Sequence, residues 1–131
     1  MGPTDSAADA GGEREAGMLQ IRHVAGGGDR AIVAAAGQVD LATAPRLAEA
    51  LAQAQAGGIG ETVLDLTAVD FLDSVGVGVL VEAAVAARQR GAALSVRGAT
   101  GWVARVLEIT GVDEYLRVVP ARSTGTADPD R

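Results

Sequence analysis

The sequence contains no cysteine and no lysine, and its single histidine is His23. Without cysteine, disulfides, thiolate metal sites and cysteine nucleophiles are excluded, and a cytoplasmic location fits. Without lysine, a Walker-type phosphate loop, a Schiff base and the lysine of a receiver domain are excluded. One histidine cannot build a multi-histidine metal site, and no residue at a readable spacing supplies it with a catalytic partner. We therefore predict no metal site, no catalytic residue and no cofactor of the chain's own.

Aromatic residues are also scarce, since Phe71, Trp102 and Tyr115 are the only three, whereas aliphatic residues fill every periodic stretch. The length of 131 residues is typical of one domain with a modest core. No apolar run reaches the ~20 residues of a membrane span. No basic segment precedes an apolar stretch, as it would in a secretory signal. We therefore expect no membrane insertion.

The net charge of −6 argues against a nucleic-acid partner, because phosphates need a basic face. Part of this charge lies near the ends of the chain, where four acidic residues stand against Arg14 within residues 1–17. Residues 1–17 and 121–131 have no apolar periodicity. We predict that they are disordered tails on either side of one domain over residues 18–120.

Within that domain, strand-like and helix-like patterns alternate in the order β-β-α-β-α-β-α-β. Strands are predicted over residues 18–24, 31–36, 61–66, 93–96 and 115–119, and helices over residues 44–56, 74–90 and 101–110. Because crossover helices join parallel strands, this order predicts an α/β fold. We expect a mixed, mostly parallel sheet of four to five strands with helices packed on it.

The chain is organised around residues 63–80, where a short apolar strand leads through a polar cluster into a buried helix. Asp73 and Ser74 stand at the predicted N-terminus of this helix. Backbone N–H groups there are unpaired and the helix dipole is positive, so the position suits a phosphate group. Asp and Ser are also common helix caps, and a purely structural role stays open.

Gly76 and Gly78 follow in the first turns of the same helix. Each costs roughly 1 kcal/mol against alanine in a helix interior, which indicates that another surface approaches the backbone closely. That surface is either the sheet of the same domain or a partner. Asp40 is either a turn residue or a residue that faces Ser74 across the strand ends, since functional loops gather at the carboxyl ends of parallel strands. Thr43 is the predicted N-cap of the preceding helix.

Four stretches of the sequence resemble the STAS family and, within it, the bacterial anti-sigma factor antagonists. They are residues 37–44 (GQVDLATA), 63–66 (VLDL), 71–80 (FLDSVGVGVL) and 106–111 (VLEITG). The resemblance implies that Ser74 is phosphorylated by a partner kinase that is also an anti-sigma factor, and Asp40 matches an acidic position near that serine. Val75 stands where the family usually has a second Ser or Thr, and Gln38 where it often has Glu.

From this resemblance we expect a partner-switching regulator that is not an enzyme. Its unmodified form would bind an anti-sigma factor with serine kinase activity and release a sigma factor, and a serine phosphatase is a candidate second partner. The expected partner-binding residues are Asp40, Thr43, Asp73, Ser74, Val75 and Gly76. One alternative is a STAS scaffold without phosphorylation, as a subunit of a lipid-transport ATPase or a larger signalling assembly. Another is a small nucleotide-binding or hydrolytic domain that uses the helix N-terminus at Asp73 and Ser74.

Overall fold

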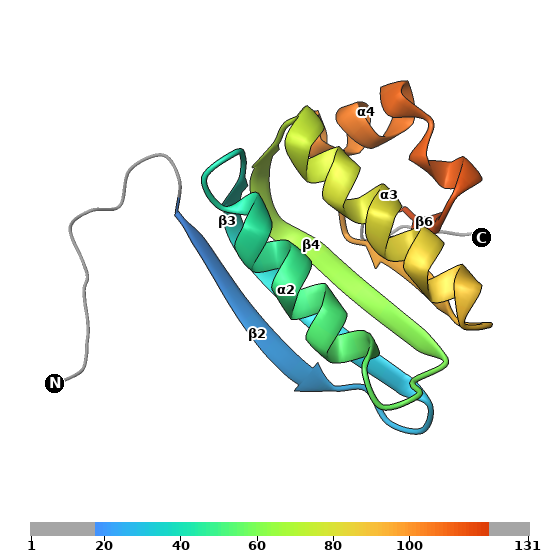
Figure 1. Cartoon of the computed structure of the whole chain (residues 1–131). Coiled ribbons are helices and arrows are strands. Elements are labelled where there is room, and N and C mark those ends of the chain that lie inside the picture. The colour runs from blue at the N-terminus through green and yellow to red at the C-terminus, as the bar shows by residue number, and fades with distance from the viewer. Residues whose placement is uncertain (1–17, 121–131) are drawn as a thin grey trace, which may run out of the picture.

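The computed structural model describes residues 18–120, and the predicted tails lie outside this range. The described residues form a five-stranded sheet with three α-helices and one short 3₁₀ helix (Figure 1). In chain order the elements are β2 (Leu19–Ala25), β3 (Arg30–Val39), α2 (Ala44–Gln55), β4 (Glu61–Leu72), α3 (Ser74–Gln89), β5 (Ala93–Arg97), α4 (Gly101–Thr110), η1 (Val112–Glu114) and β6 (Arg117–Val119). This is the predicted order of strands and helices.

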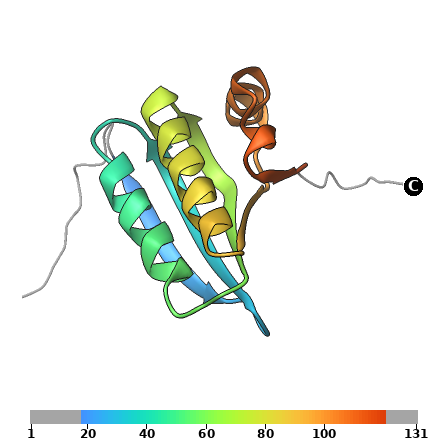
Figure 2. The ribbon, with the colours of Figure 1, turned by 45° about the vertical axis from the view of Figure 1, so that its right-hand side comes forward.

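The strands lie in the sheet in chain order, β2-β3-β4-β5-β6. β2 and β3 form an antiparallel hairpin, and the other three neighbouring pairs are parallel. Because crossovers between parallel strands are right-handed, this order places α2, which joins β3 to β4, and α3, which joins β4 to β5, on the same face of the sheet. Figures 1 and 2 show α2 and α3 side by side across that face, whereas α4 lies apart from them, in contact with β4 and η1.

A single hydrophobic cluster fills the space between the sheet and the helices. Its members are aliphatic, as the scarcity of aromatic residues requires. The largest fully buried side chains are Leu19, Leu47, Leu51, Leu64, Leu66, Leu72, Leu80, Val33, Val39, Val96, Val103 and Val112. These residues come from strands and helices throughout the described chain, so the sheet and its helices form one folding unit.

Three strands differ from the predicted bounds. β3 does not end at residue 36 but continues to Val39. β4 does not end at residue 66 but continues to Leu72, paired with the end of β3, so residues 67–72 are strand and not loop. Two register shifts, at residues 34–36 and 37–38 of β3, break the simple alternation of buried and exposed positions, which hid this strand in the sequence. β6 covers only Arg117–Val119, because η1 occupies Val112–Glu114 and Tyr115 follows it.

Candidate partner-binding and phosphorylation site

The strands β3 and β4 end side by side, and the candidate site lies where they end. Val39 and Leu72 are register partners at these ends. Beyond them the backbone N–H of Asp73 donates a hydrogen bond of 3.2 Å to the carbonyl oxygen of Val39. The turn that begins at Asp40 therefore meets the start of α3 at Ser74, as the parallel arrangement of the strands predicts.

Asp40 forms the turn between β3 and α2. Its Oδ1 accepts hydrogen bonds from the backbone N–H groups of Ala42 at 3.0 Å and Thr43 at 3.1 Å. The Thr43 hydroxyl donates to the carbonyl oxygen of Gln38 at 2.8 Å and accepts from the N–H of Asp40 at 3.0 Å. The interpretation of Asp40 as a turn residue is therefore confirmed. Its carboxylate holds its own loop in shape at the end of the strand.

The prediction for Thr43 is confirmed in position and wrong in mechanism. Thr43 does stand at the N-cap position of α2, but its side chain makes no capping hydrogen bond to the helix. Its hydroxyl is turned toward the Gln38–Asp40 loop instead. Because only 1% of Thr43 is exposed, its side chain supports the loop from inside and does not form part of the surface.

Asp73 caps α3 and thereby leaves Ser74 exposed. The Oδ1 atom of Asp73 accepts a hydrogen bond of 3.0 Å from the N–H of Gly76, and the Asp73 carbonyl accepts one from Val77. The cap predicted for the pair Asp73-Ser74 is thus carried by Asp73. Ser74 is the first residue of α3 and is exposed, and its hydroxyl has no capping role. The N–H groups of Ser74 and Val75 have no acceptor within the helix, because they belong to its first turn.

The two glycines of α3 have different surroundings. Gly76 is buried, and a Cβ atom placed on it would lie 2.6 Å from both Val39 Cγ1 and Leu72 Cδ1. The surface that approaches Gly76 is therefore the core of the same domain, so Gly76 cannot present itself to a partner. Gly78 is exposed, and a Cβ atom there would meet no atom within 4 Å apart from its chain neighbours and the adjacent backbone of its own helix.

Three large apolar side chains are exposed in the segments that meet at Ser74. The exposed fractions are 73% for Leu41, 39% for Phe71 and 40% for Val75. Val75 was among the predicted contact residues, whereas Leu41 and Phe71 were not. Exposed apolar side chains that form a contiguous patch are typical of a protein-binding surface.

The charge at this end of the sheet is negative. Segments 37–45 and 67–80 together contain Asp40, Asp70 and Asp73 and no basic residue. A phosphate group on Ser74 would therefore find no cation in either of these two segments.

Asp65 is an acidic residue of β4 whose side chain has partners within the domain. Burial raises the pKa of Asp65, but hydrogen bonds from the hydroxyl and N–H of Thr67, at 2.6 and 2.9 Å, and the nearby Arg97 outweigh it. The net result is a pKa below the usual value for an aspartate. The Arg97 guanidinium lies 3.3 Å from Asp65 Oδ2. Asp65 is therefore a structural residue of the sheet.

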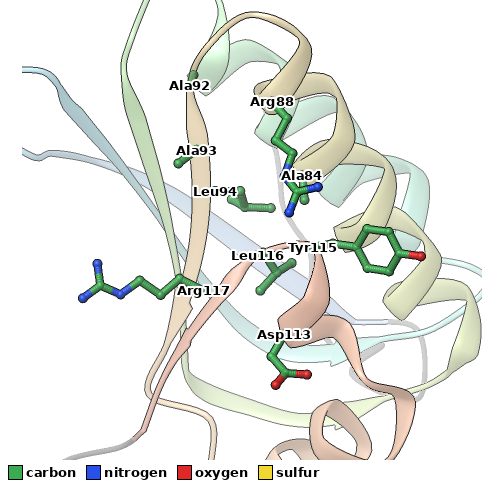
Figure 3. Close-up of a pocket in the computed structure, with 9 residues that line it drawn as sticks. All are labelled: Ala84, Arg88, Ala92, Ala93, Leu94, Asp113, Tyr115, Leu116 and Arg117. Atoms are coloured by element: carbon green, nitrogen blue, oxygen red, sulfur yellow. The ribbon is translucent and has the colours of Figure 1, made fainter.

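A pocket of about 430 Å³ lies away from Ser74, between the C-terminal half of α3, β5 and the segment from η1 to β6. In Figure 3 the Arg88 side chain points into the pocket, whereas the guanidinium group of Arg117 points away. Arg88 donates a hydrogen bond of 3.0 Å to the carbonyl oxygen of Glu114 and so links α3 to η1.

Residues 18–120 contain neither a candidate metal site nor a candidate membrane-spanning helix. No three His, Cys, Asp or Glu side chains come together there as a metal ion would require. None of the helices in this range is both long enough and apolar enough to cross a membrane.

Comparison with known proteins identifies the family. A family model described as "Mlab, STAS domain" matches residues 22–120, which is most of the chain. The chain belongs to the STAS domain family. A curated relative, the anti-sigma-B factor antagonist of Listeria monocytogenes, is 37% identical over 83 residues, which are 63% of this chain and 73% of the relative.

Solved STAS structures share this fold. An anti-sigma factor antagonist from Mycobacterium paratuberculosis superposes with a TM-score of 0.73 at 24% identity, over 82% of this chain and 90% of that one. SpoIIAA in its unphosphorylated form superposes with a TM-score of 0.67 at 13% identity, over 79% and 90% of the two chains. The structure of SpoIIAA from Bacillus is also known in the phosphorylated form. At these identities the likeness concerns the fold, and it confirms the predicted single α/β STAS domain.

Proposed function

We propose that this protein is an anti-sigma factor antagonist that binds an anti-sigma factor with serine kinase activity and thereby releases a sigma factor. The observation that carries the proposal is the exposed Ser74 at the N-terminus of α3, with the exposed Val75 and Phe71 close to it in the chain. The relative that is 37% identical supports it, since that protein is named for antagonism of an anti-sigma factor. This role is one of binding and not of catalysis, and it belongs in the cytoplasm.

The contact surface that we propose differs in part from the predicted one. Ser74 and Val75 would touch the partner directly, with Asp40 at the rim, and Leu41 and Phe71 would extend the apolar area. Asp73, Thr43 and Gly76 would act from behind this surface. Asp73 caps α3, Thr43 holds the loop, and Gly76 lets the helix pack closely against Val39 and Leu72.

Phosphorylation of Ser74 would switch the protein off. A phosphate adds a charge of about −1.5 to −2 at pH 7. The helix N-terminus tolerates that charge, so the fold would survive, but the apolar contact would have to desolvate a dianion. The kinase partner would supply ATP and Mg²⁺, and this chain would need no cofactor of its own. A serine phosphatase would reset the switch.

A second candidate is a STAS scaffold without phosphorylation, for example in a lipid-transport ATPase or a larger signalling assembly. Two observations favour it. Val75 stands where a second hydroxyl residue is usual, and the matching family model is described as "Mlab, STAS domain". The two candidates differ in whether Ser74 accepts a phosphate.

Incubation with ATP and candidate anti-sigma factor kinases, followed by mass spectrometry, tests the first candidate. We expect one phosphate on Ser74 and none on a Ser74→Ala variant. The sequence carries other hydroxyl residues, so the site must be assigned by fragmentation. Binding to an anti-sigma factor without any phosphate transfer would support the scaffold.

A further inference from the structure

Gly78 is a helix residue for which the fold itself gives no reason. It lies in the second turn of α3 (Ser74–Gln89) and is exposed, and an added Cβ would have no atom within 4 Å apart from its chain neighbours and the adjacent backbone of its own helix. Its φ angle is not among the positive ones of the chain. Apart from proline, glycine is the least favourable residue in a helix interior, and alanine could replace it here without a clash.

Gly76, two residues earlier, is by contrast a glycine that the packing of the domain itself explains. There an added Cβ would overlap Val39 and Leu72, so the packing of α3 on the sheet requires glycine. No such contact exists at Gly78 among the described residues. If an approaching surface explains Gly78, that surface must come from outside the domain.

The position of Gly78 on α3 indicates which partner would approach it. Ser74 and Gly78 are four residues apart, so they lie on the same side of α3, about 6 Å apart along its axis. Val75 is 40% exposed, and Glu82 and Val85 continue the exposed side toward the C-terminus of the helix. Gly78 therefore continues the surface around Ser74 that we propose for the anti-sigma factor.

We propose that the anti-sigma factor approaches the α3 backbone most closely at Gly78, so that this glycine sets both the affinity and the choice of partner. The inference rests on the function proposed above. The exposed neighbours describe the partner's surface. Val75 and Val85 would contact apolar side chains of the partner, and Glu82 would pair with a basic group of the partner beside them. A helix or loop with small residues at its centre fits such a narrow approach.

Two variants of the full-length chain, Gly78→Ala and Gly78→Leu, test this proposal in two measurements. Thermal unfolding of Gly78→Ala should occur roughly 2–6 °C higher than for the wild type, because alanine favours the helix and meets no atom. Calorimetric titration against purified candidate anti-sigma factor kinases from the same genome should show the opposite trend. The Kd should rise at least about threefold for alanine and at least about tenfold for leucine.

Gln89→Leu is the matched control, because it adds apolar bulk to an exposed position in the last turn of the same helix. Its Kd should stay within about twofold of the wild type. If it weakens binding as much as Gly78→Leu, the loss does not report a close approach and the proposal fails. A lower melting temperature for Gly78→Ala would also overturn it, since the position would then be packed from within.

The remaining outcomes separate this proposal from the function on which it rests. If the wild type and Ser74→Ala bind a kinase and both Gly78 variants bind equally well, the anti-sigma function stands and the role of Gly78 is refuted. If no candidate kinase binds the wild type or Ser74→Ala, the proposed function fails, and the inference fails with it.

Discussion

A Cβ atom on Gly76 would lie 2.6 Å from Cγ1 of Val39, so α3 packs on β3 at a distance that only glycine permits. Leu72 Cδ1 closes the same space from β4, also at 2.6 Å. The contact anchors the first turn of α3 above the ends of both strands. Ser74, two residues away, is exposed at the start of this anchored turn.

Replacement of Gly76 should therefore destabilise the domain. Gly76→Ala overfills a packed site, which typically costs about 1–3 kcal/mol, and Gly76→Leu should prevent stable folding. From the sequence alone we would expect Gly76→Leu to weaken partner binding far more than stability, and the burial of this residue overturns that expectation. Thermal unfolding followed by circular dichroism measures the effect, with Gly78→Ala as the paired control. A Gly76→Ala variant as stable as the wild type would contradict the packing assigned here.

The sequence alone does not predict which of the two glycines is buried and which is exposed. Their low helix propensity is visible in the sequence, and it correctly indicates a close approach. The neighbour that approaches Gly76 is Val39, which is 37 positions away in the chain. Which glycine faces Val39 depends on how α3 rotates over the sheet, and two glycines only two residues apart do not determine that rotation.

The order of elements and the place of Ser74 could be predicted for a different reason. Both depend on local signals, namely the change of hydrophobic period and the helix start at Asp73. The exposure of Leu41 and Phe71 could not be predicted in this way. Phe71 belongs to a part of β4 whose register with β3 is shifted, so alternation does not tell which side it faces. Apolar residues at such positions look like core residues until the register is known.

Asp65 should make stability depend on pH in a defined range. Its pKa is lowered in the folded state, so its stabilising effect is complete above the unfolded pKa of about 3.9 and is lost as the pH falls through the folded pKa. At pH 7, Asp65→Asn should therefore melt a few degrees below the wild type, and the difference should shrink as the pH falls below the unfolded pKa.

Melting temperatures of both proteins at pH 7 and pH 2.5 measure this difference. Asp70→Asn is the control, because Asp70 is an exposed acid of the same strand. Its melting temperature should stay close to that of the wild type at pH 7. A gap between wild type and Asp65→Asn that is equal at both pH values would show that the carboxylate charge plays no part.

The two ends of the chain should be dispensable for folding. The hydrophobic core among the described residues extends from Leu19 to Leu116. Residues 1–17 and 123–131 contain few side chains that could add to it. Removal of both segments should leave the melting temperature within about 2 °C of the full chain. A loss of several degrees would mean that one of them docks on the domain.

The central claim is that Ser74 is a switch at a protein-binding surface. A phosphate or a carboxylate at this position should leave the fold intact, because a negative charge at a helix N-terminus is tolerated and can stabilise by roughly 0.3–1 kcal/mol. Binding should suffer, since a contact shaped for a neutral hydroxyl must desolvate the new charge at a cost of several kcal/mol. Each 1.4 kcal/mol corresponds to about tenfold in affinity.

Calorimetric titration of the wild type, Ser74→Ala and Ser74→Asp against the anti-sigma factor kinase tests this claim most directly, with circular dichroism to verify each fold. We predict that Ser74→Ala binds about as tightly as the unmodified wild type and does not lose affinity when ATP is added. Ser74→Asp should fold normally and bind at least about 10- to 100-fold more weakly. Equal affinities for all three proteins would contradict the switch and would favour the scaffold without phosphorylation.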